Sequence, residues 1–232
     1  MENTEVKDNI KKIIYYNGDI YIGNCIKRIR NGFGVYQSSS GNKYIGNFEN
    51  DNRNGIGLEI FNDGEEFIGN WENNKYNGDG KYIFSNGDTY EGNLRNGKMF
   101  GFGVLKFKNG GEYLGYFEDG RKKGFGIRTY PNNERYEGEW NMSIKEGLGK
   151  FIFGNGDIYE GEFKNDKRNG YGVYKSRNGI EYSGEWKDDL KHGFGCYKFE
   201  DGTKYEGEYI NDIRTGRGIF TFFDGSTQYG ES

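Results

Sequence analysis

The chain has 232 residues, of which 18% are aromatic and 41 are glycine, with a net charge of −4 and a mean hydropathy of −0.99. The slight acidic excess argues against a dedicated nucleic-acid-binding protein, because such proteins are usually basic. No apolar run approaches the roughly 18 residues of a transmembrane helix, and the polar segment from Met1 to Lys12 does not resemble a secretory signal.

The first 16 residues are interpreted as a polar segment with a half unit that caps an array. From residue 17 to residue 232, a unit of 23 residues then recurs nine times. Each unit opens with an aromatic residue (offset 0), has glycine at offset 2 and a Gly-x-Gly at offsets 11 and 13. A fixed period of this length indicates a stacked array of one supersecondary unit. Such arrays present long surfaces more often than catalytic pockets.

Each unit is predicted to contain two strands. The first begins at the opening aromatic residue and ends in a polar loop at offsets 5 to 10, such as Glu49–Asn54. The second runs through the Gly-x-Gly to an Asn-Gly or Asp-Gly pair at offsets 19 and 20, such as Asn86-Gly87. Such a pair between alternating apolar runs predicts a two-residue hairpin turn.

The two-residue turn also predicts the strand register, in which Val35 lies opposite Gly46. Offsets 0, 2, 4, 12, 14 and 16 would then share one aromatic face, while offsets 1 and 3 and the Gly-x-Gly glycines would share the other. The predicted fold class is therefore all-β: an elongated, single-layer, twisted antiparallel sheet of stacked β-hairpins.

The aromatic face is predicted to be a partner-binding groove, because rings that no second layer covers mark interaction sites. The alternative is that these rings only pack one hairpin on the next. The residues of the predicted groove are Phe48, Phe67, Trp71, Tyr90, Tyr113, Phe117, Tyr136, Trp140, Tyr159, Phe163, Tyr182, Trp186, Tyr205 and Tyr209.

Two charged columns accompany the rings. Glutamates at offsets 1 and 3 predict a solvated acidic face that could also bind Ca²⁺ or a basic partner: Glu137, Glu139, Glu160, Glu162, Glu185, Glu206 and Glu208. Basic residues at offset 9 predict a solvated edge or a contact with anionic lipid head groups: Arg30, Arg53, Lys122, Lys145, Arg168, Lys191 and Arg214.

The segment Tyr136-Glu-Gly-Glu-Trp140 with Gly147-Leu-Gly149 resembles the MORN (membrane occupation and recognition nexus) repeat. The resemblance covers about nine units, from residue 17 to residue 230. It implies a non-enzymatic scaffold or adaptor that binds a helical or extended segment of another protein. It also implies a position in the cytoplasm, at the cytoskeleton or the cytoplasmic face of a membrane, and a membrane–cytoskeleton junction as the place of action.

Two alternatives stay open at this point. One is a peripheral membrane module that contacts phospholipids through the basic column, and the other is a secreted carbohydrate-binding hairpin repeat. The only histidine, His192, has no partner at catalytic or metal-ligand spacing, so no catalytic residue, cofactor, metal or nucleic acid is expected. Cys25 and Cys196 lie seven units apart and are expected to be reduced. Terminal strands would also allow a homodimer.

Overall fold

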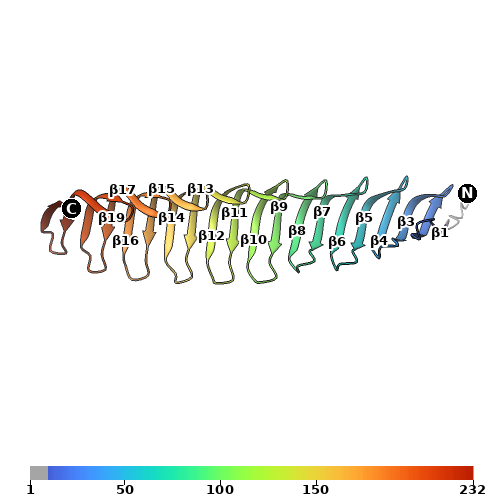
Figure 1. Cartoon of the computed structure of the whole chain (residues 1–232), viewed down its shortest axis with the longest axis horizontal. Helices are drawn as coiled ribbons and strands as arrows, with labels where there is room; N and C mark the ends of the chain where they lie inside the picture. Colours follow the sequence, from blue (N-terminus) through green and yellow to red (C-terminus); the bar gives the residue numbers. More distant parts are fainter. Residues whose placement is uncertain (1–9, 232) are drawn as a thin grey trace, which may run out of the picture. The chain divides into compact units, whose positions relative to one another are not determined.

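The structure, a computed structural model, describes residues 10–231, which form twenty β-strands and no helix. Residues 1–9 of the predicted N-terminal segment lie outside this described part. The described residues group into two compact units, 10–108 with 117–120 and 109–116 with 121–231. The predicted all-β class of stacked antiparallel hairpins is confirmed (Figure 1).

The first unit is a series of consecutive hairpins. Its strands are β1 (Ile10–Ile14), β2 (Ile20–Ile26), β3 (Ile29–Gln37), β4 (Lys43–Glu49), β5 (Asn52–Ile60), β6 (Glu66–Glu72), β7 (Lys75–Ile83), β8 (Thr89–Arg95) and β9 (Lys98–Lys106). From β1 to β9, each strand pairs antiparallel with the next one in the chain. Each repeat therefore rests on its sequence neighbours.

The second unit repeats this arrangement. Its strands are β10 (Glu112–Glu118, of which 112–116 belong to this unit), β11 (Arg121–Thr129), β12 (Arg135–Asn141), β13 (Ile144–Ile152), β14 (Ile158–Lys164), β15 (Lys167–Lys175), β16 (Glu181–Lys187), β17 (Leu190–Lys198), β18 (Lys204–Ile210), β19 (Ile213–Thr221) and β20 (Thr227–Glu231). Consecutive strands from β11 to β20 pair antiparallel.

The first connection of each repeat is a tight turn at offsets 6 and 7. In the turn Asn165-Asp166 both residues have positive φ, 51° and 67°. Lys164 and Lys167 pair directly on either side of it. Two positive φ values between paired residues define a type I′ turn, which Asn and Asp tolerate. The predicted polar loop at offsets 5 to 10 is therefore wrong, because strand pairing resumes at offset 8.

The Asn-Gly connection is longer than predicted. At Asn155-Gly156 only the glycine has a positive φ, 89°. The Phe153 amide donates to the Asp157 carbonyl at 2.9 Å, and the Gly156 amide donates to the Phe153 carbonyl at 2.8 Å. Three residues thus join the strands, as in a type I turn followed by a left-handed glycine. A two-residue type I′ turn would need positive φ at both central residues.

This extra turn residue shifts the register by one. Gly34, rather than Val35, pairs with Gly46, and Val35 pairs with Ile45. Because side chains alternate between the faces of a strand, a slip of one residue moves the whole set to the other face. The predicted position of offsets 12, 14 and 16 on the aromatic face is therefore wrong. The same shift moves the glycine at offset 13 onto the aromatic face.

Two faces follow from the corrected register. We call the face with the opening aromatic residues, the glycines at offsets 2 and 13 and the rings at offset 4 the ladder face. The face with offsets 1, 3, 12 and 14 is the open face. The rings of the ladder face are buried, whereas the apolar side chains at offset 12 on the open face are exposed to solvent.

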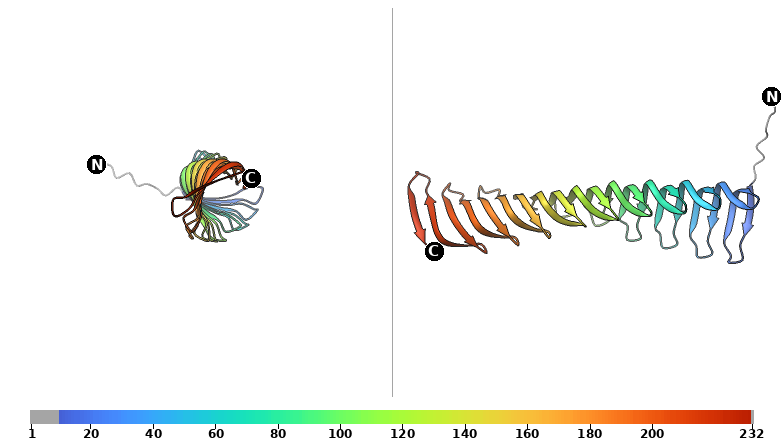
Figure 2. Two further views of the ribbon diagram at one scale, coloured as in Figure 1. Left: turned by 90° about the vertical axis from the view of Figure 1, so that its left-hand side faces the viewer. Right: turned by 90° about the horizontal axis from the view of Figure 1, so that it is seen from above.

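The core of each repeat is an aromatic ring, tyrosine in eight of the nine repeats and Phe67 in the third. The ring lies against the glycines at offsets 2 and 13, which we call the glycine floor. Tyr136 is fully buried, and a Cβ placed on Gly138 would meet its Oη at 2.5 Å and the Cα of Gly149 at 2.6 Å. A Cβ on Gly149 would meet Cε2 of the same ring at 2.5 Å. The register shifts between Gly138 and Trp140, and such a bulge bends a strand. The hairpins accordingly appear as curved ribbons in Figure 2.

Candidate functional site

The ladder rings are buried by the bend of their own hairpins. Every residue of the predicted groove is at most 5% exposed, and Tyr136, Tyr159 and Tyr182 are 0% exposed. The sequence predicts that some of these rings stay accessible, because a single layer has no second sheet above it. The bulged strands and the neighbouring repeats supply the missing cover. These side chains consequently offer a partner almost no surface.

Polar bonds and edge-to-face contacts fix the ladder rings. Tyr159 Oη donates to the Glu162 carbonyl at 3.0 Å, and Trp186 Nε1 donates to the Gly172 carbonyl at 3.2 Å. The Tyr159 ring meets Phe163 and Trp186 edge to face, at centroid distances of 5.2 and 5.4 Å. Such ring pairs contribute about 0.5–1.5 kcal/mol beyond their area burial. The ladder therefore acts as the hydrophobic core.

The basic residues at offset 9 cover this core. Arg168 Cζ lies 4.2 Å from the Trp186 ring centroid, and Arg168 Nε lies 3.1 Å from Asp189 Oδ1 in the next turn. Each of the seven predicted members has its charged group within 5.0 Å of a ring centroid: Arg30, Arg53, Lys122, Lys145, Arg168, Lys191 and Arg214. Cation–π contacts and ion pairs thus link one repeat to the next.

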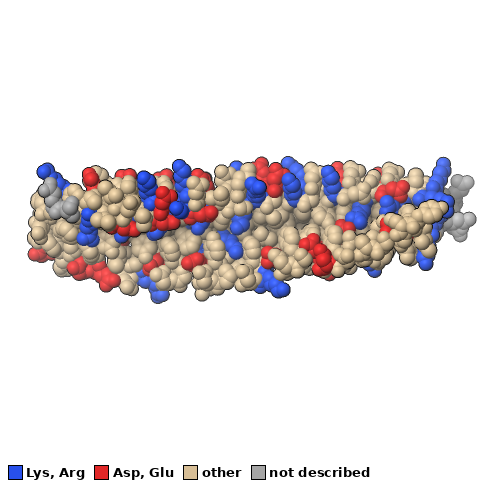
Figure 3. Space-filling view, in the orientation of Figure 1, with Lys and Arg blue, Asp and Glu red and all other residues tan. Residues whose placement is uncertain are grey.

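Burial changes the titration of three lysines in this column. It lowers the pKa of Lys122 to about 8 and also lowers the pKa values of Lys145 and Lys191. Basic residues that attract an anionic membrane reach its head groups, whereas these three ammonium groups lie over rings of the ladder face. On the face shown in Figure 3, basic and acidic side chains are interspersed rather than gathered by sign. The geometry of the basic column gives the membrane hypothesis no support.

We expect the chain to lose stability steeply above about pH 10. Burial raises the pKa values of Tyr21, Tyr44 and Tyr90 from 10.0 to about 12, and it also raises those of Tyr136 and Tyr159. A raised pKa favours the protonated native state, so this stabilisation is complete below about pH 10 and is lost as the pH rises through the native pKa values. Thermal melts with tyrosinate absorbance, from about pH 8 to about pH 12, measure it. A melting temperature that stays constant over this range would contradict the buried ladder.

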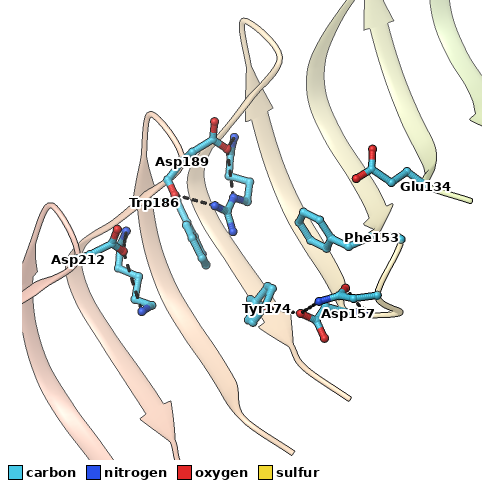
Figure 4. A pocket seen from close by; sticks show the side chains of 11 residues that line it. Glu134, Phe153, Asp157, Tyr174, Trp186, Asp189 and Asp212 are labelled. Carbon is cyan, nitrogen blue, oxygen red and sulfur yellow. Dashed lines mark hydrogen bonds and ion pairs between the residues drawn. The ribbon is translucent and has the colours of Figure 1, made fainter. Parts of the chain in front are cut away.

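A pocket of about 630 Å³ opens in the second unit and is lined in part by Arg168, Trp186, Tyr174 and Asp157 (Figure 4). Tyr174 Oη donates a hydrogen bond to Asp157, which lowers the pKa of that carboxyl. Arg168 is already paired with Asp189. Arg168 and Asp157 are thus each already engaged by a neighbouring side chain.

The open face presents a column of apolar side chains to solvent. In the second unit four of the five residues at offset 12 are apolar, Phe125, Leu148, Tyr171 and Phe194, with exposed fractions of 56%, 64%, 58% and 63%, and the fifth is Arg217. The sequence interpretation missed this column as a surface feature because the register error placed it among the ladder rings. If the Asn-Gly turn had been predicted with three residues, the resulting strand register would have placed this column on the face opposite the rings. Exposed apolar side chains gathered on one face mark candidate interaction sites.

The first unit carries a similar column with a different neighbourhood. Phe33, Ile56 and Phe102 are exposed at offset 12, and Asp79 interrupts the column between them. The polar residues at offset 3 in this unit are asparagines: Asn24, Asn47, Asn70 and Asn93. At offset 3 the first unit therefore carries neutral asparagines, with Asp79 as a single carboxylate in the offset-12 column, whereas the second unit carries glutamates at offset 3 in most of its repeats.

In the second unit the glutamates alternate with the apolar residues across the strands. Leu148 pairs with Glu162, and Tyr171 pairs with Glu185. The Tyr171 amide donates to Glu162 Oε1 at 2.9 Å, and the Phe194 amide donates to Glu185 Oε1 at 3.3 Å. The order across the sheet is consequently Leu148, Glu162, Tyr171, Glu185, Phe194, which we call the mixed row. Each glutamate also closes the bulge of its hairpin.

The predicted acidic face lies on this open face. Glu137 pairs with Arg135 and Glu160 pairs with Lys150, both at 2.6 Å, whereas Glu162 accepts a backbone hydrogen bond. Residues 10–231 contain no group of three or more side chains that could hold a metal ion. The Ca²⁺ alternative therefore has no geometric support, and a basic partner remains.

A groove of about 1000 Å³ lies on the open face towards the end of the second unit. Its walls include Tyr171, Phe194, Ile219 and Tyr229, and the backbone of several glycines forms part of its lining. Glu208 stands among these apolar groups. The groove continues the mixed row with apolar walls and the carboxylates of Glu206 and Glu208, and Arg217 adds a basic group to its lining. Cys196 also lines this groove. Both cysteines of the chain, Cys25 and Cys196, are free thiols.

The described part of the chain has no helix that is long and apolar enough to cross a membrane. A family model for the MORN repeat matches nine consecutive segments of the sequence. The matched residues are 29–43, 44–66, 67–89, 90–112, 113–135, 136–158, 159–181, 182–204 and 205–227. A search of curated proteins finds no match.

Several solved structures are similar to this one at low identity. The TCP10 domain of Danio rerio CPAP, in complex with a peptide of STIL, has 12% identity and a TM-score of 0.46, covering 96% of this chain and 99% of that chain. The Drosophila melanogaster SAS-4 TCP domain, in complex with a proline-rich motif of Ana2, has 12% identity and a TM-score of 0.35, with coverages of 100% and 96%. Virginiamycin B lyase from Staphylococcus aureus has 13% identity and a TM-score of 0.17, with coverages of 97% and 71%.

Proposed function

Because the chain belongs to the MORN-repeat family, we propose that it is a non-enzymatic scaffold that binds a segment of another protein across its open face. The column of exposed apolar side chains, one in most repeats, is the observation that carries this proposal. Repetition places these contacts at regular intervals, so a long segment can engage several repeats at once. The charged groups of the ladder-face pocket pair with one another, which favours binding over catalysis.

The proposed binding face differs from the one that the sequence predicted. The ladder rings are at most 5% exposed, whereas Leu148 and Tyr171 on the open face are 64% and 58% exposed. Contact energy in protein interfaces is concentrated in a few side chains, often aromatic ones such as tyrosine, that become desolvated on binding. The family resemblance supports a position in the cytoplasm, at the cytoskeleton or the cytoplasmic face of a membrane, as part of the same proposal.

Loss of the open-face column is expected to weaken partner binding without unfolding the chain. The variant replaces Phe125, Leu148, Tyr171 and Phe194 with serine, and all four are more than half exposed. Partners that co-purify with the chain from its native cell are identified and then tested for direct binding to the purified chain. We expect at least a tenfold loss of affinity, which corresponds to about 1.4 kcal/mol, with an unchanged melting temperature.

A matched control removes exposed apolar groups elsewhere. Tyr16 is fully exposed and Phe223 is 88% exposed, and both lie in turns rather than on the open face. Replacing both with serine should leave partner binding intact. If the open-face variant stays folded and keeps every partner at wild-type affinity, the proposed function is refuted.

A further inference from the structure

We infer that the open face of the second unit selects a basic amphipathic α-helix that lies across the strands. This inference rests on the proposed function and adds the conformation and charge of the bound segment. The contact surface is the mixed row Leu148, Glu162, Tyr171, Glu185 and Phe194, whose order is fixed by strand pairing and backbone hydrogen bonds.

The spacing of the mixed row matches a helix. Neighbouring strands lie about 4.8 Å apart, so an apolar side chain recurs about every 9.6 Å with a glutamate midway. A helix rises about 1.5 Å per residue, which places residue i+7 about 10.5 Å from residue i and residues i+3 and i+4 at about 4.5 and 6 Å. All of these positions share one helix face. Apolar residues at i and i+7 with Lys or Arg between them therefore meet Leu148, Glu162 and Tyr171 in order.

Other conformations match the row less well. In an extended strand, residues on one face are about 6.6 Å apart. This spacing does not match the distance of about 9.6 Å between successive apolar side chains of the mixed row. A polyproline II segment repeats every three residues, about 9.3 Å, which suits the apolar residues. It has no residue on the same face midway between them, where Glu162 and Glu185 stand. The helix is the conformation that satisfies both sets of side chains.

The charge of the row determines the charge of the helix. Glu162 and Glu185 are solvent-exposed, and Oε1 of each accepts a backbone hydrogen bond on the sheet. Glu208 continues the series opposite Phe194. In the first unit the corresponding residues are Asn47 and Asn70, which carry no charge. At offset 3 a cationic helix therefore gains ion pairs on the second unit that the asparagines of the first unit do not provide, and charge complementarity sets the register.

The direct test uses a synthetic three-heptad peptide with leucine at i, i+7 and i+14 and lysine at the i+3 and i+4 positions. Fluorescence anisotropy measures its affinity for the full chain, and circular dichroism measures helix formation on binding. Changing both Glu162 and Glu185 to glutamine keeps the backbone hydrogen-bond acceptors and removes the charges. We expect binding about tenfold weaker in this variant, the size of effect that 1.4 kcal/mol produces, and a similar loss with Tyr171→Ser.

Three controls separate the sequence-specific complex from general charge attraction. A scrambled peptide of the same composition should bind at least tenfold more weakly. A peptide with proline at every third position, which forms polyproline II, should also bind more weakly. The paired variant Phe33→Ser with Ile56→Ser, on the first unit, should bind the helix at wild-type affinity because these exposed side chains are not members of the mixed row.

The helix inference fails if the scrambled or proline peptide binds as tightly as the heptad peptide, or if the glutamine variant has wild-type affinity. It also fails if the heptad peptide does not bind. In each case the proposed function is judged separately, by whether the four-serine open-face variant loses the native partner. A retained native partner together with heptad-peptide binding would refute the proposed function and leave the helix site in place.

Discussion

Replacing Gly138 with alanine is expected to destabilise its repeat by about 3 kcal/mol, the upper part of the range for an overpacked core. A Cβ at this position would stand 2.5 Å from Tyr136 Oη and 2.6 Å from the Cα of Gly149. The tyrosine cannot move aside at low cost, because its Oη donates to the Glu139 carbonyl at 2.9 Å. The Trp140 ring, 5.1 Å away between centroids, confines it further.

Chemical denaturation of the purified chain measures this loss. Gly179→Asn serves as the matched control, because Gly179 has a φ of 91° and no atom lies within 4 Å of the position that a Cβ would occupy. Asparagine tolerates the left-handed conformation, so the control should cost less than about 1 kcal/mol. Equal stability of the Gly138→Ala variant and the wild type would show that the ring does not lie on the glycine floor.

Replacing Trp186 with alanine is expected to cost about 3–5 kcal/mol, as for other buried aromatic residues. The side chain is 4% exposed, and its ring meets Tyr159 and Tyr182 at centroid distances of 5.4 and 5.1 Å. The substitution also leaves the Gly172 carbonyl without the indole donor. Arg168, 4.2 Å above the ring, would face a cavity.

The control for Trp186→Ala is the same kind of substitution at an exposed aromatic residue of the array. Tyr171 is 58% exposed on the open face, so Tyr171→Ala should change the free energy of unfolding by no more than about 0.5 kcal/mol. Thermal and denaturant melts of the two variants give the comparison. A Tyr171 variant as unstable as the Trp186 variant would contradict the assignment of the two faces.

The sequence predicts the strands of this chain well because its period is strict. The aromatic-x-glycine motif and the Gly-x-Gly of every repeat lie on strands, and the Asn-Gly pairs lie in turns. The failure concerns turn type. Asn155-Gly156 is compatible with a two-residue turn and with a three-residue turn that ends in a left-handed glycine, and local sequence does not choose between them. One residue at this position decides which face each side chain of the second strand occupies.

At the connection at offsets 6 and 7, the sequence predicts a longer loop than the structure has. Asn165-Asp166 lacks glycine and lies in a polar run, so the sequence predicts a loop there. In the structure this pair forms the type I′ turn that is predicted for the Asn-Gly pairs. Packing of the strands, rather than the turn itself, supports the observed register, because only glycine at offsets 2 and 13 leaves room for the tyrosine ring. Packing between repeats, rather than turn preference, determines the result.

The candidate site is only partly predictable from the sequence, because the bend of each hairpin also determines where its side chains lie. The sequence predicts a solvated face for the glutamates at offsets 1 and 3, but the closure of each bulge by Glu162 or Glu185 depends on a bend that the sequence does not specify. It predicts the basic column at an edge, whereas a residue such as Arg168 covers the ladder. Both features follow once the hairpin is bent, because bending brings offsets 4 and 9 together on the ladder face.

The corrected register gives the two faces separate physical roles. The ladder face holds the repeats together through buried rings such as Trp140 and the cations that cover them. The open face contributes little to stability through exposed residues such as Leu148, so its side chains are available for recognition. Substitutions at offset 12 should therefore alter binding without altering the fold, and substitutions at offset 0 should do the reverse.

Hydroxyl-radical footprinting of the folded chain, read residue by residue by mass spectrometry, tests this division most directly. The expected result is rapid oxidation of Phe125, Tyr171 and Phe194 on the open face, together with protection of Tyr136, Tyr159 and Trp186 on the ladder face. Protected offset-12 rings together with reactive ladder rings would contradict the assignment of the faces and the binding function proposed from it.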